Sequence, residues 1–373
     1  MKRATGLMMI VFALTACGPA ATSSPTAAPI YTPAVGSVAN DALTPTGASR
    51  LVVMSHDSFT VSEEVLDAFE QANGVTVELL KAGDTGTALN QAILSANAPL
   101  ADVFFGVDNT FLSRALEADI FEPYPSPELT NIPDEFELDP EQRLLPVDVG
   151  YVTINYDRAA LTATGLAAPS ELRELTSAAW RGKLVVQNPA TSSPGLAFLL
   201  ATIATFGEEG DYTWRDFWRE LRTNEVYISN DWTDAYYTQF SGSSGKGPYP
   251  LVVSYSTSPA AEVFFSEGAL SDAPTANLFV AGSSFRQIEF VGILKGTERR
   301  ALAERFVDFV LQEQFQNDIP LQMFVYPVNE IAQVPALFTQ FAPVPEQAAE
   351  LAPELIEANR ERWIQEWTEI MLR

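Results

Sequence analysis

The sequence predicts an α/β protein of two lobes, with mixed sheets joined by strands that cross between the lobes. Short apolar runs alternate with amphipathic segments from residue 51 onward, which is typical of strands followed by helices. The chain has 373 residues, enough for two separate cores. A strand-like run at 285–294 comes late in the chain, and we expect it to return to the first lobe.

The first residues have the parts of a secretory signal. Two basic residues form the positive start, residues 6–14 form a short apolar core, and small residues precede Cys17. The apolar core is too short to remain as a bilayer span. Cys17 is the one cysteine of the chain, and it stands where a lipoprotein signal places the lipidated residue. We therefore expect residues 1–16 to be removed. A lipid on Cys17 would then anchor the protein outside the cytoplasm, in the periplasm or at the cell surface.

Composition limits the choice of partners. Residues 17–48 are rich in Ala, Pro, Ser and Thr and nearly free of charge, which predicts a disordered linker. The whole chain has 48 acidic and 22 basic residues, a net charge of −26. A chain this acidic, with no basic stripe, is a poor partner for nucleic acid. Its charge favours solubility and, where a ligand is bound, a cationic one.

The first lobe begins with a βαβαβα pattern between residues 51 and 118. The expected strands are 51–55, 75–80 and 101–106, and the expected helices are 61–72, 87–96 and 109–118. This alternation predicts a parallel sheet with helices on both faces, and ligands of such sheets collect at the carboxyl ends of the strands. Polar side chains follow those ends: His56, Asp57, Asp84 and Asp108.

A second α/β unit follows the long strand expected at 144–157. Its expected strands are 182–189, 226–230 and 249–259, and its expected helices are 195–206, 212–221 and 232–240. Helices are also expected at 298–312 and 345–373. We expect lobe 1 to comprise 49–148 and 257–328, lobe 2 to comprise 149–256, and the helices of 329–373 to pack on lobe 2.

The stretch QNPATSSPGLAFLL at 187–200 predicts the start of a helix. Ser193 suits the N-cap, Pro194 the first helical position, and residues 196–200 a buried face. The free N–H groups and the positive helix end at such a start can bind a phosphate or a hydroxyl.

Nine short blocks from residue 51 to the end carry a resemblance to a known family. They are HDSF, ADVFFGVDN, PVDVGYVTINYD, NPATSSPGL, NDWTDAY, LVVSYSTSPA, FQNDIP, YPV and WIQEW. In these blocks the chain resembles the periplasmic thiamine-binding family of bacterial ABC transporters. The resemblance implies a two-lobe, class II-like periplasmic-binding-protein fold that closes by hinge motion. It also implies capture of thiamine, or of a thiamine phosphate, for delivery to a membrane permease.

The resemblance further implies four patches of ligand contacts. They are Asp84 with Thr85, Ser192 with Ser193, Trp232 alone, and the strand end Tyr255, Ser256, Thr257 and Ser258. The chain departs from the family at three aromatic positions, where it has His56, Ala261 and Phe324. We expect His56 and Phe324 to contact the ligand all the same, together with Asp57 and Asp108 from the strand ends.

These residue types suit thiamine, whose thiazolium ring carries a permanent positive charge. A desolvated cation needs an aromatic face or a carboxylate beside it, and Trp232, Tyr255 and Asp84 provide both. A protonated His56 would repel the ring, so we expect weaker binding below about pH 6.5.

Two alternatives belong to other functional classes. An enzyme is disfavoured because His56 is the one histidine, and the glycine-rich run at 241–248 has neither P-loop nor nucleophile-elbow spacing. A binder of Fe(III) or of polyamines on the same fold stays open, since the phenols of Tyr236 and Tyr237 are of the type that binds Fe(III). No cofactor and no resident metal are expected.

Overall fold

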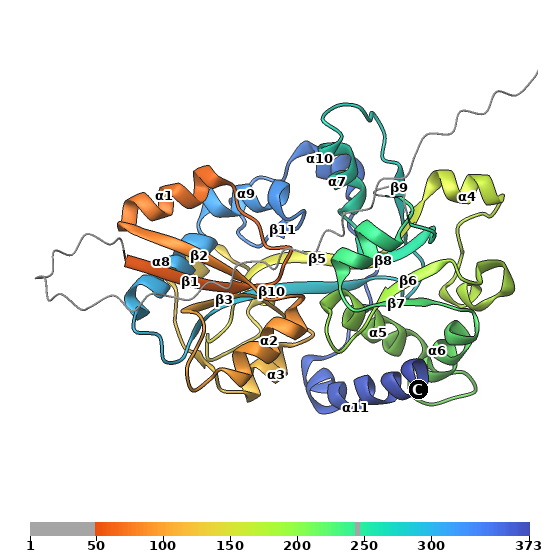
Figure 1. The fold of residues 1–373 in the computed structure, drawn as a ribbon, viewed down its shortest axis with the longest axis horizontal. Helices are drawn as coiled ribbons and strands as arrows, with labels where there is room; N and C mark the ends of the chain where they lie inside the picture. Colours follow the sequence, from red (N-terminus) through yellow and green to blue (C-terminus); the bar gives the residue numbers. More distant parts are fainter. Residues whose placement is uncertain (1–48, 243–246) are drawn as a thin grey trace, which may run out of the picture. The chain divides into compact units, whose positions relative to one another are not determined.

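The computed structural model describes residues 49–242 and 247–373 (Figure 1). The predicted signal peptide, the lipidated Cys17 and the linker lie outside the described residues. Within the described ranges, no helix has both the length and the apolar character that a membrane crossing requires.

A mixed sheet of eleven strands runs through this part of the chain, and eight of them follow the order β2-β1-β3-β10-β5-β8-β6-β7. The other three pair beside this path: β4 with β10, and β9 and β11 with β5. The strands are β1 (Ser49–Ser55), β2 (Val75–Lys81), β3 (Val103–Asp108), β4 (Phe121–Glu122), β5 (Leu145–Asp157), β6 (Leu184–Gln187), β7 (Tyr227–Ser229), β8 (Leu251–Tyr255), β9 (Thr275–Leu278), β10 (Phe285–Leu294) and β11 (Tyr326–Pro327). β1 pairs in parallel with both β2 and β3, as the βαβαβα pattern predicts.

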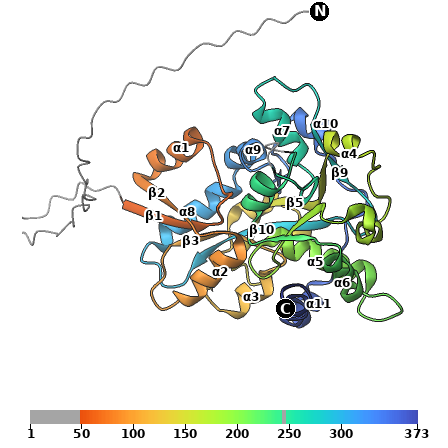
Figure 2. The same ribbon diagram turned by 45° about the vertical axis from the view of Figure 1, so that its right-hand side comes forward.

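Helices cover both faces of the sheet. They are α1 (Glu63–Asn73), α2 (Thr85–Leu94), α3 (Leu112–Glu117), α4 (Arg158–Thr164), α5 (Ser193–Phe206), α6 (Trp214–Thr223), α7 (Ser258–Phe265), α8 (Arg300–Leu311), α9 (Glu313–Gln322), α10 (Ala336–Phe341) and α11 (Pro353–Leu372). The shorter turns are η1 (Pro127–Asn131), η2 (Asp134–Phe136), η3 (Leu172–Thr176), η4 (Ala178–Trp180) and the π-helical η5 (Asp234–Gln239). Figures 1 and 2 show α2, α3, α5, α6 and α11 on one side of the sheet and α1, α7, α9 and α10 on the other.

Two long strands join the halves of the sheet, which we call the β1–β3 side and the β6–β8 side. β10 pairs antiparallel with β3 and also with β5, and β5 continues beyond this pairing to β8 and β9. The predicted return of residues 285–294 to the first sheet half is therefore confirmed, as is the presence of crossing strands. The lobe boundaries themselves stay a prediction.

The C-terminal helix contacts both sides. α11 begins at Pro353, so the helix predicted from 345 starts later than expected. Trp367 of α11 is fully buried against Trp218 of α6, with ring centroids 5.5 Å apart. Toward the β1–β3 side, Arg360 of α11 donates from Nε to the carbonyl oxygen of Thr110 at 3.1 Å.

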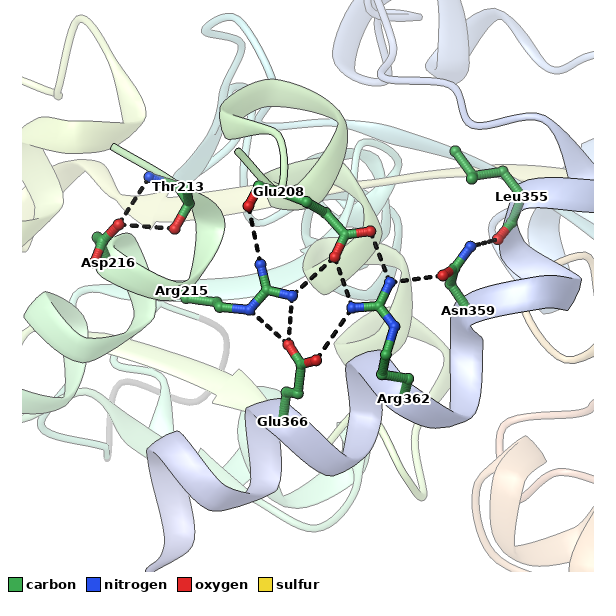
Figure 3. A network of polar contacts seen from close by, with 8 residues as sticks. All are labelled: Glu208, Thr213, Arg215, Asp216, Leu355, Asn359, Arg362 and Glu366. Atoms are coloured by element: carbon green, nitrogen blue, oxygen red, sulfur yellow. Dashed lines mark hydrogen bonds and ion pairs between the residues drawn. The ribbon is translucent and has the colours of Figure 1, made fainter. Parts of the chain in front are cut away.

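Ion pairs hold α11 to the loop before α6 and to α6 itself (Figure 3). Glu366 accepts from Arg215 at 2.6 Å and from Arg362 at 3.1 Å. Glu208 accepts from the same two arginines at 2.8 Å and 2.7 Å. Each arginine thus contacts two carboxylates and each carboxylate two arginines, so the four residues form a closed network. We call it the α11 ion network.

Candidate ligand-binding site

A cavity of about 540 Å³, its open mouth included, lies at the carboxyl ends of β1, β2 and β8. Its lining residues are His56, Ser58, Asp84, Thr85, Ser193, Pro194, Trp232, Tyr255, Glu289, Met323 and Val325. Six of the side chains predicted from sequence are among them: His56, Asp84, Thr85, Ser193, Trp232 and Tyr255. Strand ends and helix starts far apart in the chain therefore meet at one hollow, as expected for an α/β sheet.

An outer groove adjoins this cavity and shares Ser58, Trp232, Tyr255 and Met323 with it. Four more predicted residues line the groove: Asp57, Thr257, Ser258 and Phe324. The remaining three, Asp108, Ser192 and Ser256, are fully buried and line neither hollow. They lie behind the surface that a ligand would touch.

Asp84 joins the two sides of the sheet across the cavity. It is the N-cap of α2 and does not cap its own helix with its side chain. Its Oδ2 instead accepts the backbone N–H of Trp232 at 3.0 Å. Two residues further on, a Cβ on Gly86 would lie 2.9 Å from the carbonyl oxygens of Ala190 and Thr191. Only glycine allows the two backbones to approach this closely.

The start of α5 differs from the prediction by one residue. Ser192 is the N-cap and Ser193 the first helical residue, whereas the sequence pattern predicts Ser193 as the cap. The Ser193 hydroxyl donates to Oδ2 of Asp108, at the end of β3. A carboxylate of the protein itself thus contacts the first residue of α5, near the positive end of the helix.

Burial raises the pKa of Asp84 and of Asp108 to about 6 each, although hydrogen bonds partly oppose the effect. The Ser192 hydroxyl is near enough to Asp84 to lower its pKa, but it makes no well-aligned hydrogen bond among the described residues. Burial alone would lower the pKa of His56. Glu289, whose Oε2 lies 3.3 Å from His56 Nε2, and two further carboxylates outweigh burial and raise it above its usual value.

Two aromatic rings face the cavity. Trp232 stacks on Tyr236 with centroids 5.1 Å apart and an interplanar angle of 13°. The Trp232 indole N–H donates to the Ser254 hydroxyl at 2.9 Å, which fixes the plane of the ring. Tyr255 lies 6.4 Å from Trp232, ring to ring, and donates its hydroxyl to Gln287. The cavity therefore offers an indole and a phenol face, both held by hydrogen bonds.

The two tyrosines of the iron-binding alternative lie in different environments. Tyr236 is buried and donates its hydroxyl to Glu262 at 2.7 Å, and burial raises the pKa of this phenol. Tyr237 is half exposed and lies on the outer groove. Among residues 49–242 and 247–373, no group of three or more His, Cys, Asp or Glu side chains is arranged to hold a metal ion.

Sequence reasoning missed Glu289 and its neighbour Asp148. Both are carboxyl residues inside apolar strands, and both are buried. That pattern was a usable signal, because a charged residue in a buried strand needs a partner or a proton.

Comparisons with known proteins identify the family of this chain. A model of the family "Bacterial extracellular solute-binding protein" matches residues 98–358. The thiamine-binding periplasmic protein of Salmonella typhimurium is 30% identical over 328 residues, which are 87% of this chain and 94% of that protein. The corresponding protein of Escherichia coli is 29% identical over the same shares of both chains.

Solved structures support the fold. A periplasmic thiamin binding protein superposes with a TM-score of 0.76 and 27% identity, covering 89% of this chain and 100% of that one. Iron-bound HitA from Pseudomonas aeruginosa superposes with a TM-score of 0.68 at 19% identity, covering 86% and 99%, and shares the fold alone. The predicted periplasmic-binding-protein fold is confirmed, and the chain belongs to the bacterial extracellular solute-binding protein family.

Proposed function

We propose that this protein captures thiamine outside the cytoplasm and delivers it to the permease of an ABC importer. The observation that carries the proposal is the composition of the cavity. Trp232 and Tyr255 provide aromatic faces, Asp84 and Glu289 provide carboxylates, and the cavity lining contains neither lysine nor arginine among the described residues. Such a lining compensates a desolvated organic cation, and it repels an anion that has no cationic part. Relatives named for thiamine binding, 30% and 29% identical, support the same ligand.

We place the hydroxyethyl arm of thiamine toward the starts of two helices. Thr85 and Ser193 are the first residues of α2 and α5, and both line the cavity. Backbone N–H groups at helix starts suit a hydroxyl and also a phosphate. Phosphorylated thiamine is therefore part of the proposal, with its phosphate at these helix starts and its ring between the aromatic faces.

Binding, and not catalysis, is the role that this family and this site support. Fe(III) is less well supported than thiamine, because the buried Tyr236 hydroxyl is engaged with Glu262. A polyamine would also suit the carboxylates, but it has no aromatic ring to place against Trp232 and Tyr255.

The lipid on Cys17 is a proposal that rests on the sequence alone. Mass spectrometry of the protein from membranes tests it, with Cys17→Ser as the unlipidated control.

Tryptophan fluorescence of the full chain tests the ligand. The sequence has six tryptophans, and of these only Trp232 lines the cavity or the outer groove in the described structure. We expect saturable quenching by thiamine and by thiamine diphosphate, and none by spermidine or Fe(III) citrate. Saturation by Fe(III) or by spermidine, without a response to thiamine, contradicts the proposal.

A further inference from the structure

Three acidic residues form a row across neighbouring strands beside the cavity. In the sheet register, Glu289 of β10 lies opposite Asp108 of β3 on one side and opposite Asp148 of β5 on the other. Directly opposite residues of antiparallel strands project to the same face, with Cβ atoms about 5 Å apart. Asp108 and Asp148 are fully buried, and Glu289 is 5% exposed. Three carboxyl groups therefore lie close together in a region from which water is largely excluded.

The three carboxyl groups of this row differ in how many hydrogen-bond donors contact them. Asp108 accepts from the N–H and the hydroxyl of Thr110 and from the Ser193 hydroxyl. Glu289 contacts His56 Nε2 and accepts from Gln287 Nε2 at 3.1 Å. Neither oxygen of Asp148 has a donor among the described residues. A bare carboxylate in such a position is strongly disfavoured.

A proton on Asp148 removes this difficulty. The strand register places the Asp148 and Glu289 side chains next to each other on one face of the sheet, and two carboxyl groups so placed can form a hydrogen bond only when one of them is protonated. Burial, together with the charge of Glu289, raises the pKa of Asp148 well above its usual range. His56 lies on the other side of Glu289, and its pKa is raised as well.

The other charged and titratable groups around the row do not replace these protons. Asp84 at the start of α2 adds a further carboxylate, and the Tyr255 phenol of β8 is neutral because burial raises its pKa. Arg360 of α11 is near Asp108, but it is held by the Thr110 carbonyl oxygen and by Glu361. The negative charge facing the cavity is therefore offset mainly by protons on the chain His56–Glu289–Asp148, which we call the proton chain.

We infer that a cationic ligand entering the cavity expels a proton from the proton chain, so that binding exchanges one positive charge for another. The inference rests on the proposed function, because it requires a ligand with a fixed charge. One N–H bond of His56 or one O–H bond of Asp148 breaks, the positive charge of the ligand offsets the positive charge lost or the negative charge left behind, and the proton passes to a buffer base. Glu289 lines the cavity between the two and becomes the counter-ion of the ligand.

Calorimetry of the full chain tests this exchange. Thiamine is titrated at pH 7 in two buffers of low and high ionisation enthalpy, phosphate and Tris. We expect the heats to differ between the two buffers because protons are released, and the affinity to rise with pH by up to about tenfold per pH unit, which is the limit for release of one proton. Saturable binding with equal heats in both buffers overturns the exchange and leaves the proposed function standing. No binding of thiamine in either buffer overturns the proposed function and the exchange with it.

Variants identify the source of the proton. His56→Gln and Asp148→Asn each keep a hydrogen-bonding side chain of similar size and remove one titratable group. We expect proton release to fall in at least one single variant and to vanish in the double variant. Asp67→Asn, on the exposed surface of α1, is the matched control and should release as much as the wild type. Undiminished release in a folded double variant overturns the assignment. If the double variant does not fold, the comparison of buffers on the wild type still decides.

Discussion

Asp84 accepts the backbone N–H of Trp232 at 3.0 Å and so joins two residues 148 positions apart across the cavity. The same carboxylate lines the cavity beside the indole ring. This contact between the two sides of the sheet is thus made by residues that would also touch the ligand. Closure of the site and recognition of a cation are expected to depend on one another.

Asp84→Asn is the first test of this dependence. The amide oxygen can still accept from Trp232, but the negative charge facing the ligand is lost. We expect thiamine to bind roughly 30-fold more weakly, about 2 kcal/mol, as for the loss of a charged partner in a desolvated site. Calorimetry at pH 7.5 measures the change, with exposed Asp67→Asn as the control. Equal affinity of the Asp84 variant and the wild type would show that this carboxylate does not face the ligand.

Two substitutions of Trp232 distinguish the effect of its aromatic face from the effect of its volume. Trp232→Phe keeps an aromatic face with a weaker quadrupole, whereas Trp232→Leu keeps only apolar volume. We expect a loss of affinity of about threefold for the first and at least about tenfold for the second, since a desolvated cation–π contact is worth roughly 1–2 kcal/mol. Competition against a labelled thiamine measures both variants without relying on the removed fluorophore. Similar losses in the two variants would argue for packing instead of a cation–π contact.

Much of the fold could be predicted because its signals are local. The segments β1 to α3 alternate in pattern over short distances, so each strand and helix is visible in its own residues. The late return of β10 was also visible as an isolated strand-like run. The beginning of α11 was not, because residues 345–352 resemble a helix in composition while the chain there pairs Ala349 with Phe285.

The site could be predicted only in part for the same reason. His56, Asp84 and Trp232 stand at strand ends or in distinctive blocks. The row of Asp108, Glu289 and Asp148 depends on strand register between segments more than 100 residues apart, which no local pattern reveals. The partner of Ser193 likewise comes from the opposite side of the sheet. Long-range register, and not residue type, was the missing information.

Stability against pH gives a third prediction. The pKa of Asp108 is about 6 in the folded protein, well above the usual 3.8, because the group is buried. The folded state therefore keeps a proton there that the unfolded chain has lost, so the free energy of unfolding falls as pH rises from about 4 to about 6. Asp108→Asn lacks this loss. Between pH 4 and pH 7.5, we expect the free energy of unfolding of the variant to rise by about 1–3 kcal/mol relative to that of the wild type.

Urea unfolding without ligand at both pH values measures this gain. The hydrogen bonds that the substituted amide makes less well cost the same at either pH, so they cancel in the difference. Asp67→Asn, which is exposed, should run parallel to the wild type. If the free energy of unfolding of Asp108→Asn changed with pH as that of the wild type does, the Asp108 carboxyl would be ionised in the folded protein with little penalty.

The α11 ion network gives the last prediction. Hydrogen bonds from Arg362, with help from Arg215, lower the pKa of Glu208 to about 2, against burial that would raise it. The network therefore stabilises the fold above the usual glutamate pKa, near 4.5, and this contribution is lost as pH falls toward 2. Glu366→Gln leaves Arg215 and Arg362 with one carboxylate instead of two. Because the side chains are partly exposed, we expect a cost of only about 1 kcal/mol at pH 7.

Glu369→Gln is the matched control, since Glu369 pairs only with the exposed Arg373 at 3.6 Å among the described ion pairs and should cost less than about 0.5 kcal/mol. Urea unfolding at low and high salt compares the two variants. The difference between them should shrink at high salt, because screening weakens exposed ion pairs. Thiamine affinity should be unchanged in both variants, since none of these residues lines the cavity. Equal costs for Glu366→Gln and Glu369→Gln would mean that the network adds nothing to the tryptophan packing that already holds α11 against α6.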